Sequence, residues 1–188
     1  ARNTQIHFAF SCFRVFVSSV TVLALAGCRV SMSPVQNRLA PGQEAFAVFV
    51  ATGEAGVGDL FAVRADGGTT FPITYTRVRE MTPALSPLGT DVAFLREGVR
   101  DDRSSRRVIV MNLLNGGGRV IPVGSVPPDA VAWSDDASTL FIRAGDATLA
   151  AAAPPQEPGT RTLDPAEAGR ADSAFAVFVG TPAFARVI

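Results

Sequence analysis

The feature that most constrains the fold is a repeat of short apolar segments at a spacing in the high forties. The pair Ala45-Phe46 returns as Ala93-Phe94 and again as Leu140-Phe141, at spacings of 48 and 47 residues. A segment that ends in Asp66-Gly67-Gly68 returns, 49 residues later, as one that ends in Asn115-Gly116-Gly117. A period in the forties with four short strands per unit is typical of a propeller blade. One such sheet cannot bury both of its faces alone, so blades stack around an axis.

Each repeat consists of segments with the composition of β-strands. They are rich in Val, Phe and Ile and are separated by clusters of Gly, Pro, Asp and Asn, whereas no long stretch has helical periodicity. We therefore predict an all-β domain. Phe46, Phe94 and Phe141 should fill the space between blades, and Trp133, the only tryptophan, should face a neighbouring blade. The predicted strands are Ala45–Val50, Asp59–Arg64, Asp91–Arg96, Arg107–Leu113, Val120–Val123, Ala130–Trp133 and Thr139–Arg143.

Two short motifs recur within these repeats. The first motif consists of Pro83, Ser86, Pro87, Gly89, Ala93 and Phe94, and its second copy of Trp133, Ser134, Asp136, Leu140 and Phe141. The second motif consists of Leu60, Phe61, Asp66, Gly67 and Gly68. Over about residues 44–145 these motifs resemble the TolB-type propeller repeat. The chain differs from that repeat at two positions: it has Leu88 where the family has Asp, and Ala137 where the family has Gly. The resemblance implies a propeller fold and suggests a role in envelope-integrity complexes.

The repeats lie at roughly 44–78, 79–124 and 125–165, with a partial fourth at 172–188. We therefore predict a partial or small β-propeller of three to four blade-like four-stranded sheets in a domain spanning 44–188. The TolB-type propeller, by comparison, has six blades. An open twisted sheet and a truncated reading frame are the alternatives.

The hexamer Ala45–Val50 returns unchanged as Ala174–Val179. The second copy is predicted to be a strand that pairs beside the first blade or adds to a second copy of the protein, because a sheet left open exposes an unpaired edge. The intervening segment Ala150–Arg170 is rich in Ala and Pro, which predicts a loop or a degraded strand.

The first 28 residues have the pattern of a secretion signal. Arg14 precedes an uncharged apolar stretch over residues 15–26, which is too short to span a membrane. It ends in Leu25-Ala26-Gly27-Cys28, which resembles the lipobox of bacterial lipoproteins. The resemblance implies a signal peptide over 1–27 and a lipid on the Cys28 thiol, so that the membrane is a partner through this anchor. A signal peptide without lipidation and a buried apolar helix are the alternatives.

Residues 28–43 are polar and contain two prolines, which predicts a tether between the anchor and the domain. Arg29 follows the cysteine at a position where an inner-membrane retention signal usually has Asp. This favours the periplasmic face of the outer membrane, if the source is Gram-negative.

The residues after Gly27 include no histidine, no lysine and no cysteine other than Cys28. Nucleophile–base pairs and phosphate-binding lysine loops are therefore not expected, and we predict no enzyme activity, no cofactor and no metal. All 17 acidic residues and 15 of the 17 basic residues lie after Gly27. This balance gives no electrostatic reason to expect a nucleic-acid partner.

Three charged segments were considered as binding sites. The pairs Asp101-Asp102 and Asp135-Asp136 have oxygens suited to calcium, although adjacent carboxylates more often face water beside arginines. The segment Arg96–Arg107 has five arginines among three acidic residues, which predicts a solvated, self-neutralising hairpin tip. The alternative is that this tip reaches an anionic partner such as lipid headgroups or an acidic protein face.

These observations lead to the hypothesis of a membrane-anchored cell-envelope lipoprotein whose TolB-like propeller is a non-catalytic module that binds an envelope protein. The alternatives are a glycan- or peptide-binding sensor subunit beside an envelope enzyme, and a truncated propeller fragment. Fold alone does not decide among them.

Overall fold

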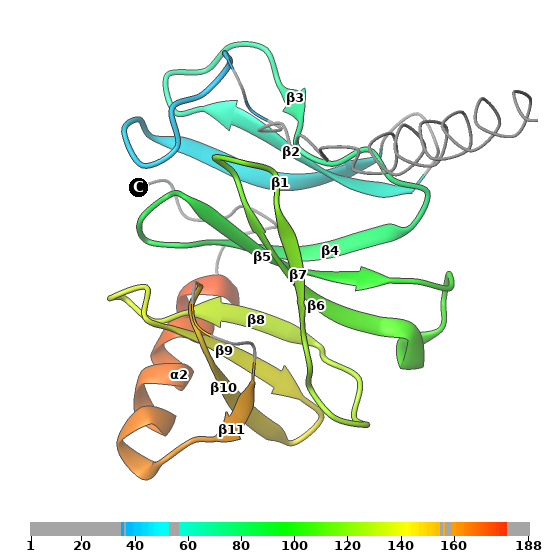
Figure 1. Ribbon diagram of the computed structural model, residues 1–188, viewed down its shortest axis with the longest axis vertical. Helices are drawn as coiled ribbons and strands as arrows, with labels where there is room; N and C mark the ends of the chain where they lie inside the picture. Colours follow the sequence, from blue (N-terminus) through cyan, green and yellow to red (C-terminus); the bar gives the residue numbers. More distant parts are fainter. Residues whose placement is uncertain (1–34, 36, 53–56, 155, 157–158, 180–188) are drawn as a thin grey trace, which may run out of the picture. The chain divides into compact units, whose positions relative to one another are not determined.

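Three antiparallel sheets follow one another along the chain in the computed structural model, which describes residues 35, 37–52, 57–154, 156 and 159–179 within the unit Met32–Ile188 (Figure 1). We call the sheets blades 1, 2 and 3. Blade 1 has β1 (Phe46–Thr52), β2 (Gly58–Arg64) and β3 (Phe71–Pro72); blade 2 has β4 (Arg79–Leu85), β5 (Asp91–Glu97), β6 (Arg106–Asn112) and β7 (Gly118–Ile121); blade 3 has β8 (Ala130–Trp133), β9 (Thr139–Ala144), β10 (Ala147–Ala152) and β11 (Thr160–Thr162).

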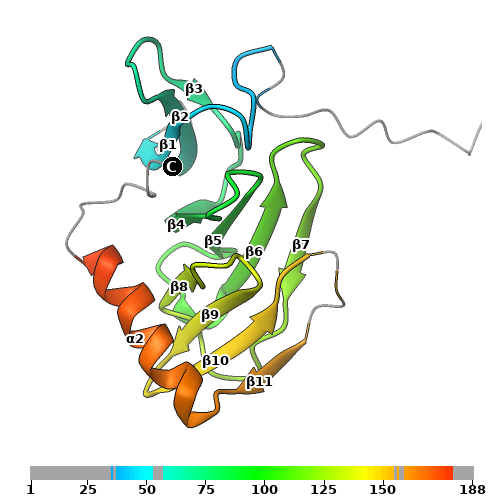
Figure 2. The same ribbon diagram turned by 90° about the vertical axis from the view of Figure 1, so that its left-hand side faces the viewer.

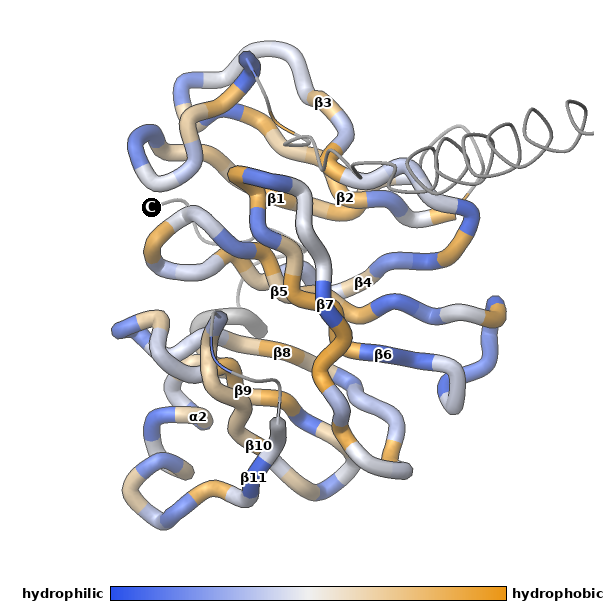
Figure 3. Tube along the Cα trace, viewed as in Figure 1, coloured by the Kyte–Doolittle hydropathy of each residue, from blue (hydrophilic) through white to orange (hydrophobic). Residues whose placement is uncertain are grey.

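This arrangement confirms the predicted fold class, an all-β partial propeller of three to four sheets. Within each blade, strands adjacent in sequence pair antiparallel. Apolar residues concentrate in the strands and polar residues in the loops that join them (Figure 3). The described residues also contain one α-helix, α2 (Pro165–Val179), and a short 3-10 helix, η1 (Arg103–Ser105).

In blades 2 and 3 the same turn joins the first strand to the second. In blade 2 the Ser86 N–H donates to the Asp91 carbonyl at 2.8 Å, and the Asp91 N–H donates to the Ser86 hydroxyl at 3.2 Å. In blade 3 the Ser134 N–H donates to the Thr139 carbonyl at 2.9 Å, and the Thr139 N–H donates to the Ser134 hydroxyl at 2.9 Å. The two serines are therefore structurally equivalent.

This equivalence corrects the predicted role of one aromatic residue. Counting from the two serines, Phe141 occupies the position of Ala93, one residue away from the predicted match with Phe94. A shift of one residue turns a strand side chain to the opposite face of its sheet. Phe46 and Phe94 accordingly pack between blades 1 and 2 as predicted, whereas Phe141 faces α2 on the far side of blade 3.

A continuous apolar layer joins each pair of blades. Trp133, 7% exposed, lies between blades 2 and 3, and its indole N–H donates to the Ala84 carbonyl of β4 at 2.9 Å. The layer between blades 1 and 2 includes Phe46, Val48, Leu60, Val92, Phe94 and Ile109; the layer between blades 2 and 3 includes Leu95, Val108, Val131, Trp133, Leu140 and Ile142.

The predicted fourth blade is wrong for the residues that the structure describes. Ala174–Val179 belongs to α2 and not to a strand. The helix begins with a reciprocal cap, in which the Glu167 N–H donates to the Asp164 carboxylate at 2.8 Å and the Asp164 N–H donates to the Glu167 carboxylate at 3.2 Å. Pro165 at the first helical position and the alanines that follow also favour a helix.

α2 covers the outer face of blade 3 (Figure 2). Ala171 and Phe175 pack against Ala132, Phe141 and Ala150 of this face. The helix therefore takes the place where a further blade would pack. The segment Ala150–Arg170, predicted to be a loop or a degraded strand, contains the second half of β10, then β11 and then the first turns of α2.

Among the described residues, blade 1 has three strands where blades 2 and 3 have four. The strand it lacks is the counterpart of β4 and β8, which precede the second strand in their blades. In this position the chain forms turns, in which the Leu39 N–H donates to the Val35 carbonyl at 3.1 Å and the Gln43 N–H donates to the Ala40 carbonyl at 2.9 Å. As a result, β1 is an edge strand of its sheet.

The packed domain begins earlier than predicted. Val35 and Leu39, in the segment predicted to be a tether, are buried in the layer between blades 1 and 2. Their apolar side chains complete the core beside β1, so this part of residues 28–43 belongs to the domain. The signal peptide, the lipobox with Cys28 and residues 180–188 lie outside the described residues.

Candidate functional site

A cleft of about 670 Å³ opens between blades 1 and 2, at the end of the blades where the β1–β2 and β5–β6 hairpins turn. We call it the interblade cleft. Its volume is within the usual range for ligand sites. It is lined by Val50, Ala51, Thr52, Val57, Gly58, Arg77, Val78, Arg79, Glu80, Met81, Thr82, Glu97, Gly98, Arg100 and Asp101.

One wall of the interblade cleft depends on a glycine. A Cβ atom at Gly58 would lie 2.9 Å from the Glu80 carbonyl oxygen and 3.0 Å from a methyl group of Val50. Backbone atoms cannot move aside as a flexible side chain can, so a larger residue would push β2 away from β4. Gly58 thus sets the close approach of the two blades at this wall.

The floor contains the buried carboxylate of Glu80, which ties blade 1 to blade 2. Glu80 accepts hydrogen bonds from the Arg96 guanidinium, at 3.1 Å from Nε and 2.6 Å from Nη2. It also accepts one from the Thr74 hydroxyl, which in turn accepts a bond from the Leu60 N–H at 2.9 Å. Its charge is therefore compensated from within the protein, as a buried carboxylate requires.

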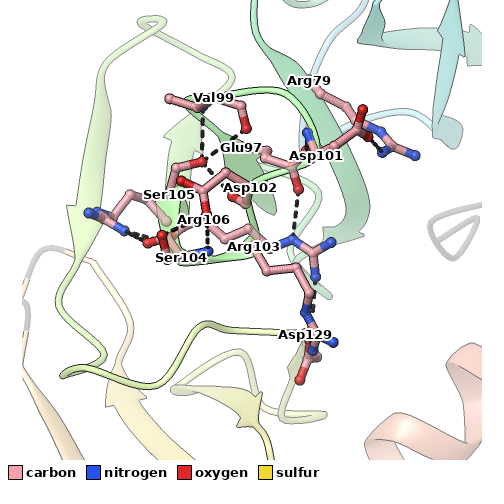
Figure 4. Close-up of polar contacts among 11 residues, drawn as sticks. Arg79, Glu97, Val99, Asp101, Asp102, Arg103, Ser104, Ser105, Arg106 and Asp129 are labelled. Carbon is pink, nitrogen blue, oxygen red and sulfur yellow. Dashed lines mark hydrogen bonds and ion pairs between the residues drawn. The ribbon is translucent and has the colours of Figure 1, made fainter.

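A second buried carboxylate, Glu97, holds the two sides of the β5–β6 hairpin together (Figure 4). It accepts hydrogen bonds from Arg106 Nε at 2.9 Å and from the Asp101 N–H at 2.7 Å. The Arg106 bond holds the pKa of Glu97 below its ordinary value. Arg106 and Arg103 also contact Asp129, which precedes β8.

The tip of this hairpin is held in one conformation by its own polar groups. The Asp102 carboxylate caps η1 by accepting the Ser104 N–H at 2.9 Å, and the hydrogen bonds from Ser104 lower the pKa of Asp102. The Val99 N–H donates to the Ser105 hydroxyl at 2.9 Å. The five arginines of the predicted self-neutralising tip have different contacts. Arg96, Arg103 and Arg106 form ion pairs with acidic side chains, and Arg107 donates hydrogen bonds to backbone carbonyls. Arg100 lines the interblade cleft.

The rim of the interblade cleft is cationic. Its exposed charged side chains are Arg77, Arg79, Arg100 and Asp101. Asp101 contacts two of the guanidinium groups: Arg79 at 3.7 Å (Figure 4), and Arg100 at 3.8 Å. Exposed ion pairs of this length are weak. Since Glu80 and Glu97 are buried and already paired, a ligand meets three guanidinium groups and one carboxylate.

The innermost strand of blade 2 is distorted inside the cleft. The register between β4 and β5 shifts between Met81 and Ala84, which marks a β-bulge. At the bulge Thr82 has φ 48°, in the left-handed region that β-branched residues rarely adopt. Its Oγ1 atom is buried and makes no hydrogen bond to the described residues. Strain and an unsatisfied hydroxyl beside a cleft are typical of a functional position.

The two acidic pairs considered for calcium are placed apart. Asp136 accepts hydrogen bonds from the Ser134 hydroxyl at 2.6 Å and the Ser138 N–H at 3.0 Å, and these bonds lower its pKa to about 2. It lines a separate groove of about 600 Å³ beside α2 and Trp133. Across the residues that the structure describes, no three His, Cys, Asp or Glu side chains gather as a metal site.

The predicted lipidation site is not among the residues described. Within the part of the chain that is described, no helix has the length and apolar character needed to cross a bilayer. The sequence indicates the charged segment Arg96–Arg107 but gives no comparable signal for Arg77, Glu80 and Thr82. For Thr82 the sequence does contain one indication: Pro83 follows it, and a proline within a strand interrupts the hydrogen-bond ladder and indicates an irregular strand.

The comparisons with known proteins support the fold. No family model and no curated protein matches the chain. Among solved structures it is similar to TolB from Acinetobacter baumannii, with 15% identity and a TM-score of 0.50 over 80% of this chain and 35% of that one. It is also similar to a putative TolB from Agrobacterium tumefaciens, with 14% identity and a TM-score of 0.50 over 63% of this chain and 45% of that one. The chain thus spans less than half of either structure, and at these identities the likeness shows a shared fold: a partial propeller of the TolB-like kind.

Proposed function

We propose that this chain is a non-catalytic module that binds a partner protein at the cell envelope through the interblade cleft. The observation that carries the proposal is the cleft itself, with exposed guanidinium groups at its rim and neutralised carboxylates beneath them. Such a site favours an anionic ligand over a cationic one. The partner's contacting segment is therefore acidic.

The polar groups around the cleft support binding more than catalysis. Glu80 and Glu97 each hold a guanidinium group, and Glu80 also links blade 2 to blade 1 through Thr74, so both act in the framework of the site. The hairpin tip is already ordered by its internal hydrogen bonds. A surface that is ordered before binding loses less conformational entropy on association.

The location at the envelope is proposed from the sequence. Residues 15–28 have the pattern of a lipoprotein signal, and a lipid on Cys28 places the domain close to a membrane. The buried Val35 lies seven positions after Cys28, a reach of about 25 Å when the chain is fully extended. The cleft would therefore bind partner proteins that lie at the same membrane surface or extend to it.

Site-specific photo-crosslinking in living cells tests this function. A crosslinking residue at Val99, exposed beside Arg100, should capture a defined envelope protein. The same residue at Leu114, equally apolar and exposed on a turn outside the cleft, is the matched control and should not. Capture from Val99 should fall when Arg77 and Arg100 are replaced by Glu and persist with Arg107→Glu. Equal capture at both positions, or none at Val99, would refute the proposal.

A further inference from the structure

The interblade cleft borders the end of β1, which is an edge strand of blade 1 among the described residues. In blades 2 and 3 the first strand, β4 or β8, flanks the second strand on the inner side of the sheet. In blade 1 the corresponding residues form turns, and β1 lies at the edge. The last three residues of β1, from Val50 to Thr52, line the cleft.

The hydrogen-bond pattern shows which backbone groups of β1 are directed to this edge. The Ala65 N–H donates to the Ala45 carbonyl at 3.0 Å, so these two residues form a hydrogen-bonded pair. Since such pairs alternate along an antiparallel ladder, Ala51 bonds β2. Val50 and Thr52 therefore direct their N–H and C=O groups away from β2, to the edge that borders the cleft.

The opposite wall suits a strand-like ligand. The bulge at Met81–Ala84 bends β4 and places Thr82, with its unsatisfied hydroxyl, in the lining of the cleft. Arg79 is on the same strand, and Arg100 projects from the neighbouring hairpin. β1 itself contains no charged residue and no proline from Phe46 to Thr52, so it lacks the features that commonly prevent edge pairing.

We propose that an extended acidic segment of the partner protein adds to β1 as the fourth strand of blade 1. Its backbone bonds Val50 and Thr52, and its carboxylates meet Arg79 and Arg100. This mode of binding rests on the proposed function, because it specifies how the same cleft recognises its partner. Backbone hydrogen bonds supply affinity that does not depend on side chains, and the guanidinium groups select acidic sequences.

The test measures binding of fluorescent model peptides to the full chain in detergent. The probe is a heptapeptide of alternating Glu and Val, with Glu at both ends, which places all carboxylates on one face of a strand. Two analogues carry N-methyl groups, one on the Glu residues and the other on the Val residues. A further analogue has Lys in place of Glu. A strand bonded along one edge uses alternate N–H groups, so only one of the two N-methylated peptides should lose affinity, by about tenfold or more.

A protein variant checks the same contact from the other side. Val50→Pro removes an N–H that is directed to the edge and leaves the bonds to β2 in place, so it should weaken the probe about tenfold. Val50 also packs against the layer between blades 1 and 2, so Val50→Ala, which keeps the N–H, is the matched control and should bind the probe like the wild type. The Lys peptide should bind more weakly than the Glu peptide by at least this factor. These results would support strand addition to β1.

Other outcomes separate this inference from the proposed function. Equal binding of both N-methylated peptides, or no binding of the Glu probe, would overturn strand addition. Specific crosslinking from Val99 would leave the function intact in either case. Loss of affinity with Val50→Pro alone, without the N-methyl effect, would also overturn strand addition, because it would show an indirect change in the cleft.

Discussion

Replacement of Trp133 by Phe tests the contact between the innermost strands of blades 2 and 3. The indole N–H donates to the Ala84 carbonyl at 2.9 Å, and both residues are buried. Phe retains most of the ring packing but leaves this carbonyl without its donor. An unsatisfied buried acceptor destabilises a protein by about 1–3 kcal/mol. For a domain of this size each kcal/mol lowers the melting temperature by about 2–4 °C, so Trp133→Phe should lower it by about 5 °C.

Thermal and urea unfolding followed by far-ultraviolet circular dichroism measure this loss. Trp133→Ala, which also removes the ring, should be destabilised by about 3–5 kcal/mol, whereas Leu114→Ala on an exposed turn should change stability by less than about 0.5 kcal/mol. Wild-type tryptophan emission should have the short-wavelength maximum of a buried indole. A Trp133→Phe variant as stable as the wild type, or a wild-type emission maximum typical of exposed indole, would show that the indole does not join the blades.

Three further predictions concern the anchor, the bulge and the helix cap. Cys28→Ser should leave the chain unlipidated and uncleaved, and equal incorporation of a labelled fatty-acid analogue in both forms would contradict the anchor. Thr82→Gly should raise the melting temperature by a few degrees, because release of about 1–2 kcal/mol of left-handed strain exceeds about 0.5–1 kcal/mol of added backbone entropy; a lower melting temperature would show that the bulge is unstrained. The hydrogen bond from Arg161 lowers the pKa of Glu167 from 4.5 to about 2, so this contact stabilises the fold fully above about pH 4.5 and is lost as the pH falls toward 2. Glu167→Gln should therefore lower the melting temperature at pH 6 and flatten its decline between pH 5 and about pH 2.5, and an unchanged decline would assign the acid sensitivity to other groups.

The strands could be predicted where the sequence alternates or repeats. The predicted Ala130–Trp133 agrees with β8, and the predicted Asp91–Arg96 falls one residue short of β5. The short strands β3 and β11 have two and three residues, too few for a periodic pattern, and were not predicted. The match of Phe141 with Phe94 rests on a spacing of 47 residues, whereas the hydrogen-bonded serines are 48 apart, and only the turn reveals this difference of one residue.

The recurring hexamer shows how context decides secondary structure. As Ala45–Val50 it forms nearly all of β1, where a hairpin supplies β2 as a pairing partner. As Ala174–Val179 it continues a helix that Asp164, Pro165 and Glu167 have already started, and nucleation is the costly step of helix formation. Identical local propensities therefore give different structures, and a prediction from the hexamer alone was bound to fail at one of the two sites.

The interblade cleft could be predicted only in part. The arginines from 96 to 107 are visible as a charged segment, but the cleft combines them with Val50, Gly58 and Thr82, which are far away in sequence. The cleft also borders the end of the edge strand β1, and the turns from Val35 to Gln43, where blades 2 and 3 have a first strand, were predicted to be a tether. A sequence pattern can predict a strand that forms, but it does not predict a cleft made by residues that are far apart in sequence.

The two incomplete ends of this blade stack differ in a way that bears on function. At blade 3 the apolar face is closed by α2 through Ala171 and Phe175. At blade 1 the edge strand β1 has no charged residue or proline to discourage pairing, and its last residues border a cleft with a cationic rim. Exposed apolar edges invite aggregation, so proteins generally block them. An edge that remains open beside Arg79 and Arg100 is selective, because the guanidinium groups favour acidic strands and repel basic ones. Protection against unwanted pairing and recognition of a partner would then depend on the same arginines. Neutralisation by Arg79→Gln and Arg100→Gln should therefore weaken binding of the Glu peptide and reduce its advantage over the Lys peptide.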